Sequence, residues 1–152
     1  MNTSWATLAK CVHDRARHVS LGVAVVGPGD SIWAHGGDVT FPSASTAKIP
    51  IMVTIYRMLE SNTLTLDARR VLQDEHKANG SGVLRHMQSG LQLTIADLLY
   101  LMISISDNTA TNHLIRTAGM DRINTTMKEL GMLDSRLSRF MLGRLAVQGE
   151  LE

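Results

Sequence analysis

Two residues that can act as a nucleophile and its base stand three positions apart in the segment Ser45-Thr46-Ala47-Lys48. Residues three apart share one face of a helix, so the Ser45 hydroxyl and the Lys48 amine would be neighbours there. Ser45 would lie at the amino end of the helix, whose dipole stabilises a developing negative charge. A lysine shielded from water loses its proton more readily, which would let Lys48 accept the proton of Ser45. The spacing predicts a Ser–Lys nucleophile, and the alternative is a capping Ser followed by a solvated Lys.

A second polar cluster, Ser106-Asp107-Asn108, stands between two apolar stretches, where polar residues need a structural or chemical reason. Ser106 could relay a proton to and from Lys48, and the Asn108 amide could orient both Lys48 and a substrate carbonyl. Asp107 is better suited to holding the turn through backbone hydrogen bonds. The alternative is a simple turn in which Asn108 or Thr109 caps the next helix.

The elements that would position these residues are mostly helical. Apolar periodicity and capping signals predict helices over residues 4–18, 44–61, 94–105, 109–118 and 121–130. The short runs 21–26 and 31–34, on either side of a Gly-Pro-Gly-Asp turn, predict a β-hairpin. No later segment is predicted to be a strand, which would leave the hairpin with unpaired edges. The expected fold class is therefore α+β, mostly helical, with an N-terminal helix and a β-hairpin.

Length and composition exclude several classes of protein. The 152 residues are 44% hydrophobic with a formal net charge of +1, which suits a folded domain or lobe rather than a disordered chain. Fifteen basic and 14 acidic residues give no electrostatic argument for binding nucleic acid or an acidic membrane. No apolar run reaches the ~20 residues of a membrane span.

The cysteine and histidine content gives no support for a metal site. The single cysteine, Cys11, cannot form an internal disulfide and is expected to be a buried apolar residue. The six histidines lack metal-binding spacing and are interpreted as surface or core residues, and Arg69-Arg70 as solvated helix positions. Residues 1–17 show no signal peptide, so the chain as written would be cytoplasmic, or periplasmic or secreted if a leader had been removed.

Three segments together resemble the class A serine β-lactamases and their penicillin-recognising relatives, over the chain up to about Arg139. Residues 41–50, Phe-Pro-Ser-Ala-Ser-Thr-Ala-Lys-Ile-Pro, look like the active-site helix of that family. Residues 106–112, Ser-Asp-Asn-Thr-Ala-Thr-Asn, resemble its second motif, and residues 80–84, Gly-Ser-Gly-Val-Leu, resemble the loop at the rim of its cleft.

The resemblance implies a role for each matching residue. Ser45 would be the acylated nucleophile, Lys48 its general base and Ser106 the proton relay. Asn108 and Ser81 would bind the substrate. A pairing of Ser81 with a histidine is the weaker alternative, because no Gly-x-Ser-x-Gly segment supports it.

The sequence departs from the family's pattern after these motifs. The third motif, Lys-Thr-Gly on an edge strand, is absent, and with it the remaining strands and the second backbone donor of the oxyanion hole. The family also uses a Glu after the second motif to activate the deacylating water, whereas no carboxylate stands between Asp134 and Glu150. Glu150 is the nearest candidate for that deacylation base. We therefore expect one truncated domain made of residues 1–40 (helix and hairpin), 41–139 (helical lobe) and 140–152 (tail, with 151–152 a candidate cloning remnant).

The function implied is a serine hydrolase that acts by Ser acylation on a β-lactam or a related amide or ester, with no metal or organic cofactor. Its activity would be weakened by the missing elements. An esterase of the same superfamily is one alternative, and an inactive fragment that binds acyl ligands or oligomerises is another. The expected partners are a small-molecule acyl substrate, with no nucleic acid and no membrane. The unpaired hairpin edge also favours a homodimer, with or without exchanged segments, that completes the sheet.

Overall fold

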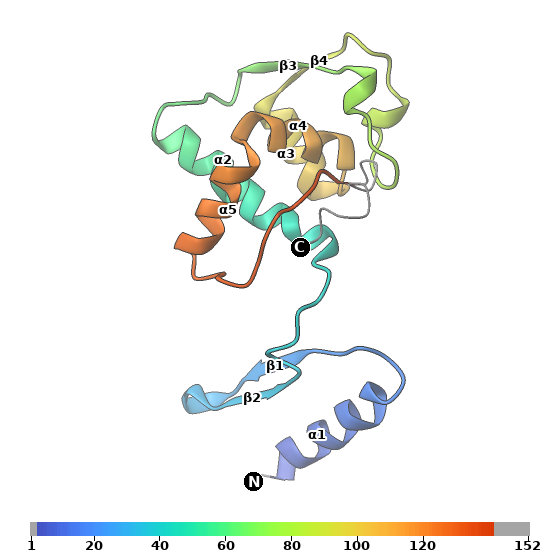
Figure 1. The fold of residues 1–152 in the computed structure, drawn as a ribbon, viewed down its shortest axis with the longest axis vertical. Coiled ribbons are helices and arrows are strands. Elements are labelled where there is room, and N and C mark those ends of the chain that lie inside the picture. The colour runs from blue at the N-terminus through green and yellow to red at the C-terminus, as the bar shows by residue number, and fades with distance from the viewer. Residues whose placement is uncertain (1–2, 142–152) are drawn as a thin grey trace. The chain divides into compact units, whose positions relative to one another are not determined.

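The computed structural model describes residues 3–141, in an α+β fold of helices with two small antiparallel sheets (Figure 1). The chain divides into two compact units, Met1–Pro42 and Ser43–Glu152. The fold class therefore agrees with the prediction from the sequence. Each unit is described by itself below.

The first unit consists of one helix and the predicted hairpin. Helix α1 spans Thr3–Ala16, and strands β1 (Val23–Val26) and β2 (Ile32–His35) pair antiparallel with Val23 opposite His35. A 3-10 turn, η1 (Pro28–Asp30), connects the strands. The predicted burial of Cys11 is wrong: its side chain is exposed, because the helix directs the neighbouring Val12 to the buried side instead.

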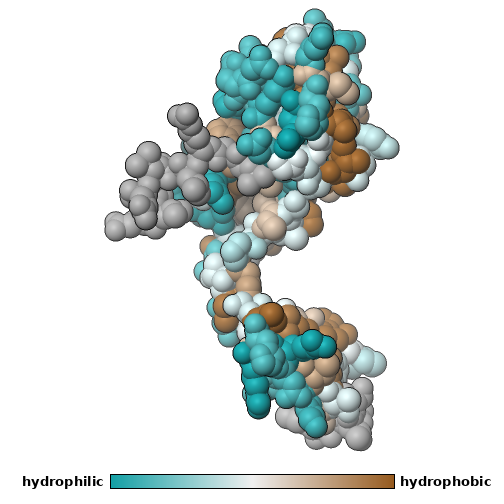
Figure 2. All heavy atoms as spheres, turned by 90° about the vertical axis from the view of Figure 1, so that its right-hand side faces the viewer, coloured by the Kyte–Doolittle hydropathy of each residue, from teal (hydrophilic) through white to brown (hydrophobic). Residues whose placement is uncertain are grey.

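The hairpin keeps large apolar side chains in contact with solvent. Val26 and Ile32, which face each other across the strands, are both mostly exposed. Hydrophobic side chains reach the surface of the second unit as well (Figure 2). The homodimer inferred from the unpaired hairpin edge stays a prediction.

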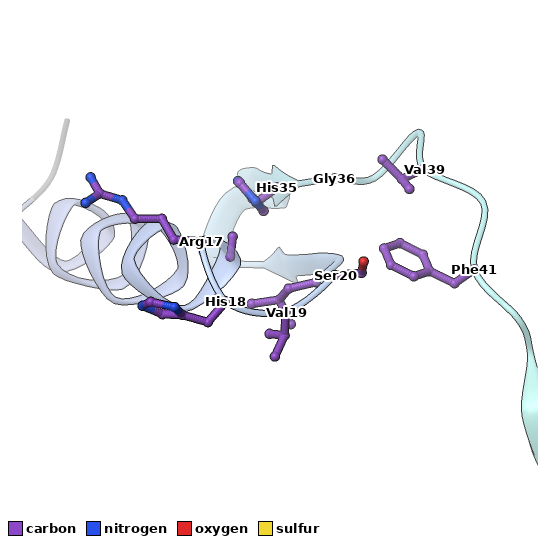
Figure 3. Close-up of a pocket in the computed structure, with 10 residues that line it drawn as sticks. Arg17, His18, Val19, Ser20, His35, Gly36, Val39 and Phe41 are labelled. Atoms are coloured by element: carbon purple, nitrogen blue, oxygen red, sulfur yellow. The ribbon is translucent and has the colours of Figure 1, made fainter.

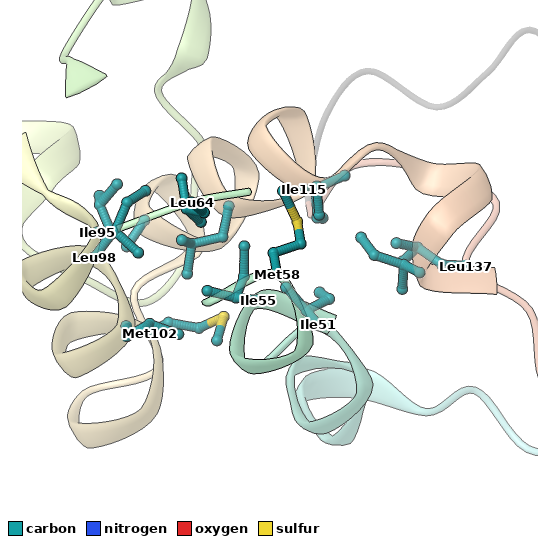
Figure 4. Packing of buried hydrophobic residues seen from close by; sticks show 14 of the residues in the cluster. Ile51, Ile55, Met58, Leu64, Ile95, Leu98, Met102, Ile115 and Leu137 are labelled. Carbon is teal, nitrogen blue, oxygen red and sulfur yellow. The ribbon is translucent and has the colours of Figure 1, made fainter. Parts of the chain in front are cut away.

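In the described part of the second unit, residues 43–141, four α-helices surround one apolar core. The 3-10 turn η2 leads into α2, and α2 packs on α4 and α5 while α3 packs mainly on α4. Ile51 and Ile55 of α2 lie in the core cluster with Ile95, Leu98 and Met102 (Figure 4). The bounds are η2 Ala44–Ala47, α2 Lys48–Glu60, α3 Ile95–Ser104, α4 Asn108–Ala118 and α5 Met120–Glu129. Helix α4 lies at the centre of this arrangement, and most of its residues are buried.

The helix starts follow local signals in the sequence. Pro50 is the third residue of α2, where its missing N–H costs no intrahelical bond. A capping box starts α3, in which Thr94 Oγ1 accepts from Asp97 N at 3.0 Å and Asp97 Oδ2 accepts from Thr94 N at 2.9 Å. Helix α4 begins one residue before the predicted start, because Asp107 supplies its N-cap.

A second small sheet lies where no strand was expected, so that prediction is wrong. Strands β3 (Arg69–Val71) and β4 (Gln92–Thr94) pair antiparallel. Each has three residues, which is too short for a readable alternation of apolar and polar residues. The prediction that Arg69 and Arg70 are solvated helix positions is also wrong, because both lie in β3. Arg70 is half-buried, and its Nε donates to Thr117 Oγ1 at 3.0 Å.

A short segment at the end of the described chain, residues 137–141, is held by two asparagines. Asn124 accepts from the N–H of Leu137 at 2.8 Å and donates to its carbonyl at 3.0 Å. Asn112 does the same for Met141, at 2.8 and 3.2 Å. The side-chain amides of α4 and α5 therefore fix this segment at both ends.

Candidate active site

The predicted Ser–Lys pair forms at the start of α2. Ser45 lies in η2, and Lys48, the first residue of α2, is buried with only 3% of its surface exposed. The distance between Lys48 Nζ and Ser45 Oγ is 3.4 Å. The alternative of a solvated lysine is therefore wrong.

Ser106 and Asn108 complete the surroundings of the Lys48 amine. Lys48 Nζ donates to Ser106 Oγ at 2.6 Å, to the Ser106 carbonyl at 2.8 Å and to Asn108 Oδ1 at 2.9 Å. These three short bonds use every proton of an ammonium, and Ser45 is the more distant fourth neighbour. Loss of one proton would leave Lys48 with a lone pair in contact with hydroxyl groups.

Ser106 Oγ lies between the lysine and the candidate nucleophile. It is 3.0 Å from Ser45 Oγ and 2.6 Å from Lys48 Nζ. A proton could therefore pass from Ser45 to Lys48 through the Ser106 hydroxyl, since each step stays within hydrogen-bond distance.

Burial lowers the pKa of Lys48 from its ordinary value, and the negative charge of Asp107 opposes this effect only in part. A lowered pKa increases the fraction of neutral amine at a given pH. Burial therefore moves Lys48 toward the neutral form, which can accept a proton, relative to a solvated lysine.

The backbone is strained on both sides of the cluster. Ala44, directly before Ser45, has φ = 45°, and Ser106 has φ = 58°, a left-handed conformation that is costly for residues other than glycine. The turn at Ser106 brings both its carbonyl and its hydroxyl to Lys48. Strain at these two positions points to a functional requirement for the geometry.

Asp107 organises the turn, as predicted, rather than facing Ser45. It is fully buried, with Oδ1 accepting from Ala110 N at 3.0 Å and Oδ2 accepting from Val83 N at 2.7 Å and Leu84 N at 3.0 Å. The carboxylate therefore ties the loop 78–84 to the start of α4. Gly82 is required for this approach, because a Cβ there would lie 2.2 Å from Asp107 Cγ.

Ser81 reaches the site through its backbone, while its side chain is exposed. The Ser81 carbonyl accepts from Asn108 N at 3.0 Å, and Asn108 Nδ2 donates to the Asn79 carbonyl at 3.0 Å. Asn79 was missed in the sequence, because its role depends on a backbone carbonyl that carries no residue-type signal. Asn112 was also missed, although it stands one helical turn after Asn108 on the same face of α4.

Glu150, the candidate deacylation base, lies outside the described residues. Within residues 3–141, no group of three His, Cys, Asp or Glu side chains could hold a metal ion. The helices described there are also too short or too polar to cross a membrane.

One cavity of about 490 Å³ belongs to the first unit alone. It is lined by the turn after α1 and the loop after β2, including His18, His35 and Phe41 (Figure 3). It contains none of the predicted site residues, which all belong to the second unit.

Comparisons with known proteins identify the family of the chain. Residues 4–150 match the model of a family described as the beta-lactamase enzyme family. Beta-lactamase OXY-1 of Klebsiella oxytoca is 30% identical over 122 residues, which are 78% of this chain and 41% of that protein.

Two solved structures are also similar. A beta-lactamase from Sphaerobacter thermophilus has 46% identity and a TM-score of 0.87, covering 95% of this chain and 55% of that one. A mutant of PBP-A, solved as an acyl-enzyme complex with penicillin G, has 26% identity and a TM-score of 0.77, covering 89% of this chain and 53% of that one. The chain thus spans about half the length of these solved structures and 41% of the curated relative.

Proposed function

Because the chain belongs to the beta-lactamase enzyme family, we propose that it is a serine hydrolase whose Ser45 is acylated by a β-lactam or a related amide or ester. The observation that carries this proposal is the buried Lys48 amine, held by Ser106 and Asn108 beside the Ser45 hydroxyl. A lysine with no chemical role would be expected at the surface, since burying it costs free energy.

The acylation step uses groups that lie within reach of one another. Neutral Lys48 takes the proton of Ser45, directly or through Ser106, while Ser45 Oγ bonds to the substrate carbonyl carbon. The carbon–nitrogen bond of the amide then breaks, and the proton returns from Lys48 through Ser106 to the leaving nitrogen. The products of this step are an ester on Ser45 and a free amine, so atoms and protons balance.

Asn108 is proposed to bind the substrate amide as well as Lys48. Its Oδ1 accepts from Lys48, and its Nδ2 is held by the Asn79 carbonyl, which fixes the plane of the side-chain amide. Ser81 is proposed to contact the substrate from the same loop, through its exposed side chain.

We further propose that the acyl-enzyme hydrolyses slowly. Among the described residues, no carboxylate bonds to Ser45, Lys48 or Ser106, and both oxygens of Asp107 are occupied by backbone N–H groups. The described part of the site therefore offers no carboxylate to activate water. Glu150 is kept as the candidate for that role.

Intact-mass spectrometry after brief exposure to penicillin G, and separately to an activated ester, tests the proposal. We expect a mass increase equal to the acyl group, persisting for minutes, that is lost in Ser45→Ala. Ser104→Ala is a matched control, because Ser104 is an exposed serine whose hydroxyl bonds to the Tyr100 carbonyl. An adduct retained in Ser45→Ala would contradict the assignment of the nucleophile. Rapid release of product without an adduct would contradict slow deacylation. The absence of both an adduct and a product would favour an inactive acyl-binding protein.

A further inference from the structure

We propose that the second unit carries a binding site for a small oxyanion of the phosphate or sulfate type, separate from the Ser45 cluster. The site is a cavity of about 390 Å³, within the range of small-molecule pockets. Arg70, His76, His113, Arg116 and Thr117 line it. It lies further along α4 than Asn108, by roughly 7–13 Å at 1.5 Å per residue.

Two imidazoles in this cavity have polar atoms without a protein partner. His113 is 96% buried, since 4% of its surface is exposed, and its ring meets the His76 ring edge-on with centroids 4.8 Å apart. His113 Nε2 and His76 Nδ1 are both buried and form no hydrogen bond within the described residues. Buried polar atoms are rarely left unpaired, so these two nitrogens leave the wall of the cavity with hydrogen-bonding capacity that no described residue uses.

Two guanidinium groups make the cavity electropositive. Arg70 is fixed by hydrogen bonds from Nε to Thr117 and from Nη1 to the Arg69 carbonyl, which use two of its five N–H groups. Arg116 stacks over the Phe140 ring at 4.6 Å from its centroid. Both arginines therefore have N–H groups to spare for an anion.

The balance of charge selects an anion over a metal cation. Arg70 and Arg116 act on His113, and Arg116 also acts on His76. The opposing carboxylates are Glu75, next to His76, and Asp107, whose oxygens are bound to backbone N–H groups. Two neutral imidazoles alone could ligate a cation, but the neighbouring guanidinium charges would repel it. An oxyanion accepts hydrogen bonds from all four side chains.

Anion binding at this site is coupled to protonation of the histidines. Burial and the arginines lower the pKa of both rings, and a bound anion opposes that effect. A protonated imidazole also donates from both nitrogens, whereas a neutral one donates from only one. The affinity should therefore rise as the pH falls from 7 to 5.

Titration of the whole chain with sulfate at constant ionic strength, followed by the imidazole NMR signals, tests the site. Sulfate is the probe because its charge is constant over this pH range. We expect saturable shifts of the His76 and His113 signals and tighter binding at pH 5 than at pH 7. Arg70→Gln should weaken binding at least about tenfold, the effect of losing one charge-assisted hydrogen bond. Arg122→Gln, which removes the same charge from an exposed position of α5, should leave the affinity unchanged within about twofold.

Three results would overturn the proposal. These are non-saturable shifts, equal weakening by Arg122→Gln and Arg70→Gln, and tighter binding of Zn²⁺ than of sulfate. His113→Phe, which keeps the ring volume, provides a second test should Arg70→Gln fail to fold, and it should reduce the pH dependence to the part that His76 contributes. Comparing inorganic phosphate with glycerol phosphate separates two sources of the oxyanion. Tighter binding of the ester indicates an organic phosphate, and equal binding indicates the free ion.

Discussion

Replacing the buried carboxylate of Asp107 should weaken the fold and alter the lysine at the same time. In Asp107→Asn, the remaining oxygen can keep the N–H groups of Val83 and Leu84, but the new amide then faces the N–H of Ala110. Loss of the N-cap costs about 1 kcal/mol, and an unpaired buried N–H costs about 1–3 kcal/mol. We expect a loss of roughly 2–4 kcal/mol in the free energy of unfolding.

The effect on Lys48 has a predictable sign. The charge of Asp107 raises the pKa of Lys48, so its removal should lower that pKa further. The acidic limb of the pH profile for Ser45 acylation should therefore move to lower pH in Asp107→Asn. A shift to higher pH would refute the electrostatic argument.

Asp97→Asn is the matched control for this experiment. Asp97 also lies at a helix start, but it is exposed and bonds only to Thr94. Urea unfolding should show a loss below about 1 kcal/mol for Asp97→Asn, and its acylation profile should not move. Equal destabilisation by the two variants would refute the view that the buried hydrogen bonds of Asp107 hold the loop to α4.

Three further substitutions test the packing and the titration of the second unit. Gly82→Ala should lower the free energy of unfolding in urea by more than about 2 kcal/mol, because Gly82 has φ = 115° and the new Cβ would overlap the Asp107 carboxylate. Gly90→Ala is the control: its Cβ meets open space, so the loss should be about 1 kcal/mol. Ile55→Ala should cost about 2–5 kcal/mol, while the half-exposed Tyr56→Ala should cost under about 1 kcal/mol. The pKa of His113 is lowered to about 4, so the unfolded chain binds more protons between about pH 4 and 6.5, and stability should fall by about 3 kcal/mol as the pH drops through that range. His113→Phe should lose this dependence, and an unchanged slope would contradict a buried neutral imidazole.

The parts of the fold that the sequence predicted are those with local signals. The hairpin follows from a Gly-Pro-Gly-Asp turn between apolar runs, and α3 follows from Thr94 and Asp97, which contact each other within one turn. Strands β3 and β4 were missed because their pairing joins residues 21 to 25 positions apart, in segments of only three residues each. Cys11 was misplaced because its burial was inferred from its residue type, whereas the buried side of α1 is the one that carries Val12.

The candidate site also has a part that local sequence signals predicted and a part that only the fold reveals. The spacing of Ser45 and Lys48 predicted their approach, since both lie on one turn of helix. The residue types of Ser106 and Asn108 suggested their contacts with Lys48, but only the fold brings them together across about 60 positions. The attachment of loop 78–84 could not be predicted, because it depends on backbone N–H and carbonyl groups that every residue possesses.

The two asparagines that hold residues 137–141 act as surrogate peptide groups. Each side-chain amide offers one donor and one acceptor, as a neighbouring strand would, so this segment has strand-like bonding without belonging to a sheet. Because these bonds reach only the backbone of Leu137 and Met141, they do not depend on the side chains of Ser138 and Arg139, whereas Phe140 packs against the core and under Arg116. Ser138 and Arg139, whose side chains are exposed, are therefore positions where the sequence can vary while the geometry next to α4 is preserved, as long as Asn112 and Asn124 remain.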